Sequence, residues 1–282
     1  MWSHRKNIRS RLGGSPIIVG AAVLVLSAVG AWQVVTEERS SASSSLTLAS
    51  LPDVVMDAHR SGAGEPGMRE NSVTAAERIL ASGRVDVLDI DTRLRGDKVL
   101  VLMHDATVDR TTDSTGPVAS YTAATWRHVH LDTGPGAPEP VPTLADYLDA
   151  VGGRAVVTVE LKDPGGLPVI TDMLRKRHLT QSVMVNTNDP QVARRIHERG
   201  LLTHLWRSAG QMRDDDPREW RSFVDVLDVD HRASDEQLRA AVHSGIRRVW
   251  AHTLTTGAQR ERMLRLGVGG IITDYPLTLD SR

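Results

Sequence analysis

Apolar runs and amphipathic stretches alternate along most of this 282-residue sequence, which predicts an α/β fold of the TIM-type (β/α)8 barrel. Nine runs are rich in Val, Ile and Leu, as expected of strands that are buried on both faces of a parallel sheet. Hydrophobic residues make up 40% of the chain and charged residues 24%, so one large buried core is possible.

The expected strands are residues 53–58, 85–90, 99–103, 155–161, 182–185, 201–206, 224–229, 247–251 and 270–273. The expected helices are residues 72–82, 143–151, 167–177, 190–199, 234–244 and 257–266. Ser234 suits the start of a helix, and Gly245 and Gly267 suit helix ends.

One strand-like run is in excess of the eight that such a barrel holds. Residues 93–98 are also too few for a helical crossover between parallel strands, so we expect an irregular barrel around the second and third strands. Residues 105–153 are rich in glycine and proline and predict a loop-rich insertion after the third strand. Such a loop at the C-terminal end of a barrel strand would shape substrate access.

The N-terminal part of the sequence predicts a targeting segment. Residues 1–15 form a basic flank, and residues 17–35 carry no charged side chain and are long enough to cross a bilayer as a helix. We expect residues 16–35 to be a transmembrane signal anchor, with the basic flank in the cytoplasm and the rest of the chain outside. The alternative is a cleaved signal peptide and a secreted protein.

The remaining domain organisation follows from composition. Residues 36–51 are rich in serine and predict a flexible linker, and residues 52–282 predict the barrel with its insertion. A net charge of −1 and an aromatic content of 4% argue against a nucleic-acid partner. The absence of cysteine excludes disulfides, thiolate metal sites and cysteine nucleophiles.

Carboxylates gather at the ends of two expected strands. Asp89 and Asp91 are two residues apart, so their side chains share one face of a strand, and Glu160 stands at the end of another strand. Three carboxylates without cysteine favour a hard cation with oxygen ligands, Mg²⁺ or Ca²⁺. The simpler alternatives are that one aspartate caps a turn and that Glu160 only pairs with Lys162.

Two histidines, His59 and His104, follow strand-like runs on the same predicted rim. Cleavage of a phosphodiester needs one group that removes a proton from the nucleophile and one that protonates the leaving alkoxide, and two imidazoles suit these roles. Arg60 and Lys162 could neutralise the phosphate. His252 also lies near the rim, and its role is left open by the sequence.

These residues stand in motifs that resemble the glycerophosphodiester phosphodiesterase family. The motifs are His59-Arg60, Glu70-Asn71-Ser72, Leu88-Asp89-Ile90-Asp91, the segment from Val101 to Thr112 around His104-Asp105, Val141-Pro142-Thr143-Leu144, Val159-Glu160-Leu161-Lys162 and Gly270-Ile271-Ile272-Thr273-Asp274-Tyr275-Pro276. They follow the order of the family and run from about residue 53 to residue 276. As an ordered set they are strongly specific.

The resemblance implies hydrolysis of glycerophosphodiesters to sn-glycerol 3-phosphate and an alcohol, with Ca²⁺ or Mg²⁺ as cofactor. It implies His59 and His104 as general acid and base, and a metal held by Asp89, Asp91 and Glu160. It also implies substrate contacts from Arg60, Lys162 and Glu70.

The sequence departs from the family at Asp89, where Glu is usual, at Ser61, where Gly is usual, and at Thr253, where Asn is usual. Asp57 also replaces a usual apolar residue. The alternatives are a non-catalytic protein that binds glycerophosphodiesters or polyglycerol phosphate, and a phosphodiesterase directed at lysophospholipids.

Overall fold

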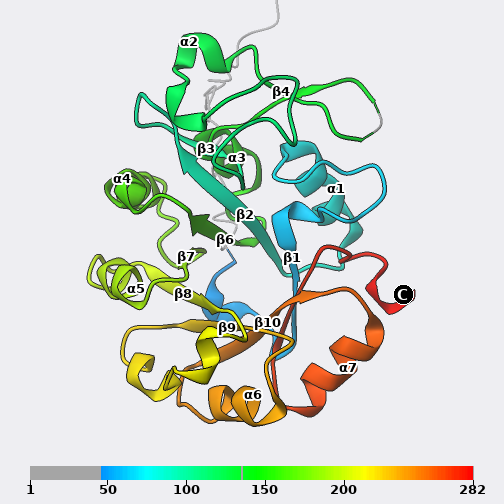
Figure 1. Cartoon of the computed structure of the whole chain (residues 1–282), viewed down its shortest axis with the longest axis vertical. Helices are drawn as coiled ribbons and strands as arrows, with labels where there is room; N and C mark the ends of the chain where they lie inside the picture. Colours follow the sequence, from blue (N-terminus) through cyan, green and yellow to red (C-terminus); the bar gives the residue numbers. More distant parts are fainter. Residues whose placement is uncertain (1–45, 135, 282) are drawn as a thin grey trace, which may run out of the picture. The chain divides into compact units, whose positions relative to one another are not determined.

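The computed structural model describes residues 46–134 and 136–281, and its centre is a closed barrel of eight parallel strands surrounded by helices (Figure 1). The barrel strands are β1 (Val55–Ala58), β2 (Val87–Leu94), β6 (Val156–Leu161), β7 (Val183–Thr187), β8 (Leu202–Arg207), β9 (Val226–Asp230), β10 (Arg248–Leu254) and β11 (Gly270–Thr273). Pairing of β1 with both β2 and β11 closes the ring. The predicted TIM-type barrel is confirmed.

One of the nine strand-like runs, residues 99–103, is not a barrel strand. It forms β3 (Leu100–Leu102), which pairs antiparallel with the C-terminal part of β2, with Thr92 opposite Leu102. Because a hairpin needs only a short turn, residues 95–99 suffice to join the two strands. This geometry is the irregularity that the sequence predicted around the second and third strands.

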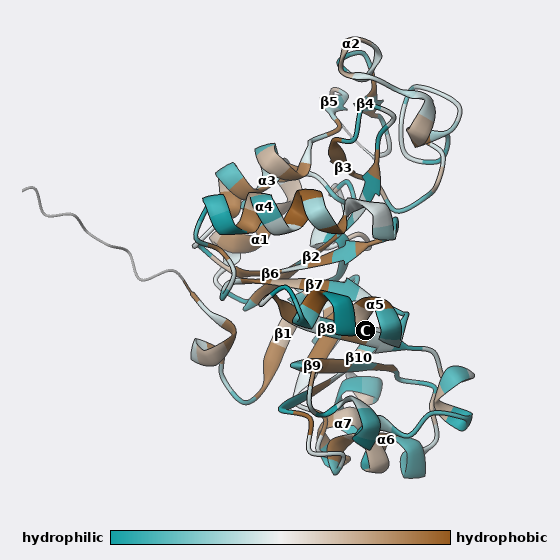
Figure 2. Cartoon of the chain, turned by 90° about the vertical axis from the view of Figure 1, so that its left-hand side faces the viewer, coloured by the Kyte–Doolittle hydropathy of each residue, from teal (hydrophilic) through white to brown (hydrophobic). Residues whose placement is uncertain are grey.

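The helices are α1 (Val73–Ser82), α2 (Ala123–Trp126), α3 (Leu144–Val151), α4 (Leu167–Lys176), α5 (Pro190–His197), α6 (Asp235–Val242) and α7 (Gly257–Arg265). The cap residues behave as the sequence indicated. The Ser234 side chain accepts a hydrogen bond from the Gln237 backbone at the start of α6, and Gly267 adopts a φ of 87° after α7. In Figure 2 the strands β1, β9 and β10 are hydrophobic, whereas α5 exposes hydrophilic residues.

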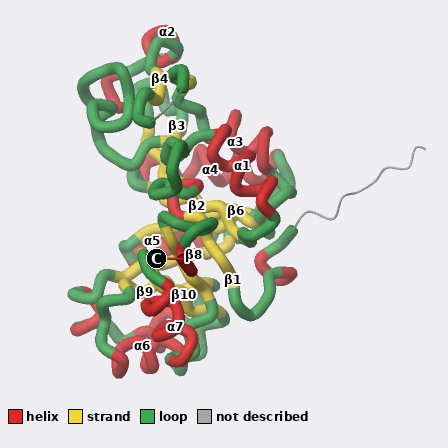
Figure 3. Tube along the Cα trace, turned by 90° about the vertical axis from the view of Figure 1, so that its right-hand side faces the viewer, coloured by secondary structure: helices red, strands yellow, loops and turns green. Residues whose placement is uncertain are grey.

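The insertion after β3 forms a small layer of its own. It contains α2 and the short strands β4 (His130–Leu131) and β5 (Glu139–Pro140), which are joined by long loops (Figure 3). Its apolar core consists of Val101, Met103, Val108, Val118, Trp126, Val129, Leu131 and Val141. Helix α3, at the end of the range expected for the insertion, instead packs on the barrel through Leu144, Tyr147 and Leu148.

The N-terminal mouth of the barrel is filled by apolar side chains. Leu48 and Leu51, from the end of the expected linker, pack there with Trp250. A β-carbon on Gly270 would lie 2.1 Å from Trp250 Cγ, so only glycine leaves room for this indole. Packing at this end confines any solvent-filled space inside the barrel to the opposite, C-terminal mouth.

The expected basic flank and signal anchor, residues 1–35, lie outside the described residues, as does most of the linker. Within residues 46–134 and 136–281, no helix has the length and apolar composition needed to cross a bilayer. The anchor therefore stays a prediction.

Candidate active site

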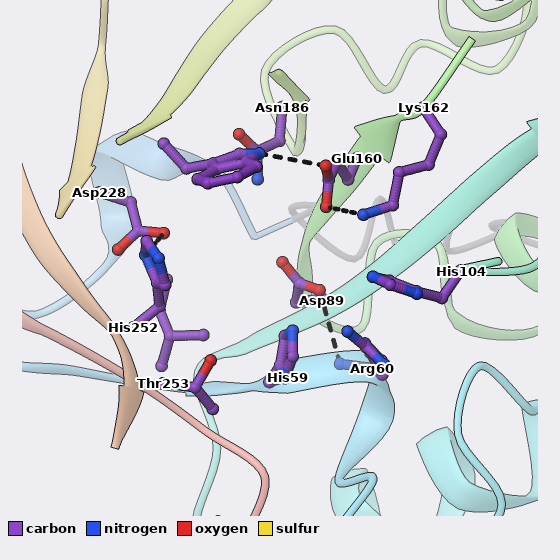
Figure 4. A pocket seen from close by; sticks show the side chains of 12 residues that line it. His59, Arg60, Asp89, His104, Glu160, Lys162, Asn186, Asp228, His252 and Thr253 are labelled. Atoms are coloured by element: carbon purple, nitrogen blue, oxygen red, sulfur yellow. Dashed lines mark hydrogen bonds and ion pairs between the residues drawn. The ribbon is translucent and has the colours of Figure 1, made fainter. Parts of the chain in front are cut away.

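A cavity of about 180 Å³ opens at the C-terminal mouth of the barrel, and every barrel strand, or the residues just after it, contributes to its lining (Figure 4). The lining residues are His59, Arg60, Asp89, His104, Glu160, Lys162, Asn186, Trp206, Asp228, His252, Thr253 and Ile272. Six of the eight site residues predicted from sequence are in this set. The other two, Asp91 and Glu70, do not line the cavity, but each forms an ion pair with the lining residue Arg60.

His59 and His104 are held in the same way, each by a carboxylate on Nδ1. His59 Nδ1 lies 2.6 Å from Asp274 Oδ1, and His104 Nδ1 lies 2.7 Å from Asp105 Oδ1. A carboxylate can only accept, so Nδ1 carries the proton in each ring and Nε2 is left for chemistry. Burial alone would lower the pKa of His59, but the hydrogen bond to Asp274 and the charges of Asp89 and Asp274 together outweigh it, and the pKa is raised.

The segment that carries His59 and Arg60 has unusual backbone geometry. Both Arg60 and Ser61 adopt positive φ angles, 49° and 60°, immediately after β1. A left-handed conformation costs a residue with a β-carbon about 1–2 kcal/mol, and such strain gathers at functional sites. The family's usual glycine at position 61 is explained by this φ. Here Ser61 is held by its hydroxyl, 2.9 Å from the Tyr147 hydroxyl.

The predicted metal ligands lie on two adjacent strands. Asp91 on β2 is paired in register with Glu160 on β6, and Asp89 stands two residues before Asp91. Burial, followed by the charges of Asp91 and Glu160, raises the pKa of Asp89 to about 7. Burial and the charge of Asp91 likewise raise the pKa of Glu160. Raised values for two neighbouring carboxylates indicate negative charge that still lacks compensation.

Asp91 is the exception among the three carboxylates, because cations already surround it. Its side chain is 1% exposed, with Lys162 Nζ 3.1 Å from Oδ1 and Arg60 Nε 3.3 Å from Oδ2. Asn71 also donates to Oδ2 at 3.1 Å. Burial opposes the effect, but the charges of Lys162 and Arg60 hold the pKa of Asp91 well below its usual range.

The three carboxylates suit a hard cation, and in the structure Lys162 lies between two of them. Lys162 Nζ donates to Glu160 Oε2 at 2.6 Å and so stands between Glu160 and Asp91. Within the part of the chain that the structure describes, no group of three His, Asp or Glu side chains is arranged to hold a metal ion as it stands. All three predicted ligands supply carboxylate oxygens, the type that Ca²⁺ and Mg²⁺ prefer.

Glu70 takes part in a network that supports His104. Arg110 donates to both Glu70 oxygens at 2.7 and 2.8 Å and to Asp105 Oδ2 at 2.5 Å, and Asp105 in turn holds His104. Glu70 also lies 3.6 Å from Arg60. Its predicted contact with substrate stays a prediction, since the described ion pairs of Glu70 are to Arg60 and Arg110.

The model of the glycerophosphoryl diester phosphodiesterase family matches residues 59–278, which include every predicted site residue. The chain belongs to this family. Membership in the glycerophosphoryl diester phosphodiesterase family makes it a phosphoric diester hydrolase, and so confirms the enzyme class expected from the motifs.

Individual relatives agree with this assignment to the glycerophosphoryl diester phosphodiesterase family. The chain is 25% identical over 264 residues to the glycerophosphodiester phosphodiesterase of Bacillus subtilis, covering 84% of this chain and 88% of that one. A solved glycerophosphoryl diester phosphodiesterase from Parabacteroides distasonis has a TM-score of 0.66 at 23% identity and covers 81% and 86% of the two chains. An Oleispira antarctica phosphodiesterase, solved with the product sn-glycerol-3-phosphate, has a TM-score of 0.69 at 19% identity and covers 83% and 97%.

Sequence reasoning missed part of the site in this member of the family. The motif that contains Asp274 indicates no role for it, and the sequence does not single out the lining residues Asn186, Trp206 and Asp228. Asp274 follows β11 directly and Trp206 is the last residue but one of β8, so their place at the C-terminal ends of barrel strands could have indicated them. Asn186 and Asp228 lie within β7 and β9. Their residue types alone carried no signal of catalysis.

Proposed function

We propose that the chain hydrolyses glycerophosphodiesters to sn-glycerol 3-phosphate and an alcohol, with His59 and His104 as the general acid–base pair and a divalent cation as cofactor. The observation that carries this proposal is the pairing of both imidazoles with carboxylates at one cavity that also contains Arg60, Lys162 and Asp89. The family match supports the substrate class.

The two histidines divide the proton transfers between them. Each imidazole keeps its Nδ1 proton on a carboxylate, so Nε2 can take a proton from the attacking hydroxyl or give one to the leaving alkoxide. The ionised partner stabilises the imidazolium that forms in either step. Burial would raise the pKa of Asp274, but the hydrogen bond with His59 and the charges of His59 and Arg60 together lower it, which keeps that partner ionised.

The phosphate would lie near Arg60 and Lys162, the two cations that line the cavity. Asp89, Asp91 and Glu160 would hold Ca²⁺ or Mg²⁺, which would neutralise phosphate charge and leave Lys162 free to contact a phosphate oxygen. In the structure Lys162 supplies part of that compensation through its contacts with Asp91 and Glu160.

The experiment follows release of glycerol 3-phosphate from glycerophosphocholine by the purified full chain, with a chelator, Ca²⁺ or Mg²⁺. We expect turnover that the chelator abolishes and one of the two ions restores, and that Asp91→Asn weakens. Binding of the diester without turnover under every condition would contradict the proposal and indicate a non-catalytic binding protein. Turnover that the chelator leaves intact would contradict the metal requirement alone.

We further propose that residues 16–35 anchor the chain in the cell membrane with the catalytic domain outside the cytoplasm. The support is the uncharged segment behind a basic flank. Protease protection in spheroplasts tests the orientation, because an external domain is digested without lysis. Release of the domain into the medium would instead indicate a cleaved signal peptide.

A further inference from the structure

One side of the cavity has no part in the proposed chemistry. Strands β7, β8, β9 and β10 contribute Asn186, Trp206, Asp228, His252 and Thr253 to the lining. In Figure 4, Asp228 and His252 lie across the cavity from Lys162 and His104, with Asp89 between the two groups. This group of five residues, the β7–β10 wall, faces whatever part of the substrate extends beyond the phosphate.

His252 is held in the same way as the two catalytic histidines. Its Nδ1 lies 2.6 Å from Asp228 Oδ2, so Nδ1 carries the proton and donates to the carboxylate. The ring also packs edge-on against Trp206, with centroids 5.6 Å apart and planes at 87°. Two contacts thus fix the imidazole, and Nε2 pairs with no described residue. A fixed ring that lines a cavity with a free nitrogen is arranged to meet a ligand.

The β7–β10 wall also contains acceptors that no donor satisfies. Asn186 Oδ1 and Asp228 Oδ1 are buried and have no hydrogen-bond partner among the described residues, although the two residues are only 4% and 3% exposed. Buried polar atoms left unpaired are costly, so such atoms beside a cavity point to a ligand or water that supplies donors. His252 Nε2 adds a third polar atom without a described partner to this side of the cavity.

The residue types of the β7–β10 wall indicate which chemical group of a phosphodiester could bind there. A second phosphate would need lysine or arginine, and the lining residues of β7–β10 include neither. A quaternary ammonium would need open aromatic faces, but Trp206 is the only aromatic side chain here apart from His252, which packs against it. Hydroxyl groups satisfy the wall, because a hydroxyl can donate to an unpaired oxygen and can pair with His252 Nε2 as donor or acceptor.

We propose that His252, positioned by Asp228, binds a hydroxyl of the substrate's glycerol group and is a specificity-determining residue for hydroxyl-bearing phosphodiesters. The inference rests on the proposed function, since it assigns the glycerol of that substrate to the β7–β10 wall. Asn186 and Thr253 lie on the same wall and complete a polar subsite for the polyol.

The test compares two ligands that differ only in hydroxyl groups, sn-glycerol 3-phosphate and n-propyl phosphate, by calorimetry with the full chain and the activating ion. Wild type should prefer glycerol 3-phosphate. His252→Asn should weaken that ligand about 5–10-fold and leave propyl phosphate within about twofold, because one hydrogen bond is lost. The Asn amide nitrogen replaces Nδ1 and keeps a donor for Asp228, whereas nothing replaces Nε2.

Two further variants control for structure. His252→Gln returns a polar group to the position of Nε2 and should recover part of the preference. His243→Asn makes the same change at an exposed histidine whose Nδ1 bonds the Arg239 carbonyl, and should change neither affinity. Melting temperatures of all variants show whether His252→Asn still folds, and His252→Gln carries the test if it does not.

The inference is overturned if wild type has no preference for glycerol 3-phosphate, or if His252→Asn weakens both ligands equally or neither. Hydrolysis of glycerophosphocholine by the same wild-type preparation is measured in parallel. Turnover without the binding difference sinks the hydroxyl subsite and leaves the proposed function intact. A binding difference without turnover sinks the proposed function and retains the subsite.

Discussion

The two sides of the barrel mouth are built on different principles. Around β1, β2, β3 and β6, charged side chains interlock: Asp91 alone contacts Lys162, Arg60 and Asn71. On the β7–β10 wall, Asn186 and Asp228 are buried with unpaired oxygens. The first side has its charges set for a phosphate before any substrate arrives. The second side has oxygen acceptors that lack hydrogen-bond donors, and a ligand can supply those donors. It is therefore better suited to recognising a ligand than to stabilising charge.

Trp206 is the residue that joins the two sides. Its indole Nε1 donates to Glu160 Oε1 at 3.1 Å, and its ring packs against His252. A substitution on one side can therefore affect the other side through the contacts of Trp206 with Glu160 and His252. Substitutions on each side should separate into effects on kcat and effects on preference between ligands.

The largest expected effect belongs to the charged side. His104→Ala should lower kcat for glycerophosphocholine by about 10²–10⁴-fold, the usual contribution of a general acid or base. His243→Ala, on the exposed surface, should leave kcat within about twofold of wild type. Steady-state kinetics measure both. A loss smaller than tenfold for His104→Ala would break the assignment of catalysis to this side.

A smaller effect is expected from the positioning residue Arg110. It bonds Glu70 and Asp105, and Asp105 holds His104, so Arg110→Ala should lower kcat about 10–50-fold with little change in KM. Arg218 is exposed and its side chain bonds only Asp216 among the described residues, so Arg218→Ala is the matched control. Recovery of kcat by Arg110→Lys would support positioning, whereas a fall in melting temperature that parallels the loss would point to structure alone.

Asp57 lies beneath both sides and should affect stability rather than catalysis. It is fully buried with no hydrogen-bond partner in the described residues, and burial, with the charges of Asp89 and Asp228, raises its pKa well above the usual value. The folded chain therefore keeps Asp57 protonated at pH values where the unfolded chain has lost that proton, which begins at about pH 4. The free energy of unfolding consequently falls as the pH rises from about 4 towards the raised pKa of Asp57.

Asp57→Asn removes this proton linkage. We expect the variant to be about 1–2 kcal/mol more stable than wild type at pH 7 and nearly equal to it at pH 4, by urea denaturation. Asp149→Asn, at an exposed pair with Arg177, should show no such gain at pH 7. Equal stability of the Asp57 variant and wild type at both pH values would show that Asp57 is compensated by a group or ion not seen here.

The smallest effect is expected at the junction between the sides. Trp206→Phe keeps an aromatic ring beside His252 but removes the donor to Glu160, and should lower kcat/KM about threefold. The same variant should keep its preference for glycerol 3-phosphate over propyl phosphate. Loss of that preference would show that the two sides are coupled more tightly than the contacts indicate.

The sequence predicted more of the charged side of the barrel mouth than of the β7–β10 wall. The barrel and its irregularity followed from hydrophobic runs and from the short segment 93–98, because local periodicity determines strands and helices. His59, Asp89 and Lys162 could be singled out because charged residues at strand ends are conspicuous. Asn186 and Asp228 could not, because their importance lies in unpaired atoms, and pairing depends on the packing of distant strands.

The hairpin of β2 and β3 has a consequence for how this chain can vary. His104 reaches the cavity from outside the ring of parallel strands, two residues beyond β3, and its carbonyl is held by Arg93 Nε at 3.1 Å. Side chains alternate between faces, so insertion or deletion of a single residue in the turn 95–99 would turn His104 away from the cavity. Natural variants should therefore conserve the length of this turn strictly.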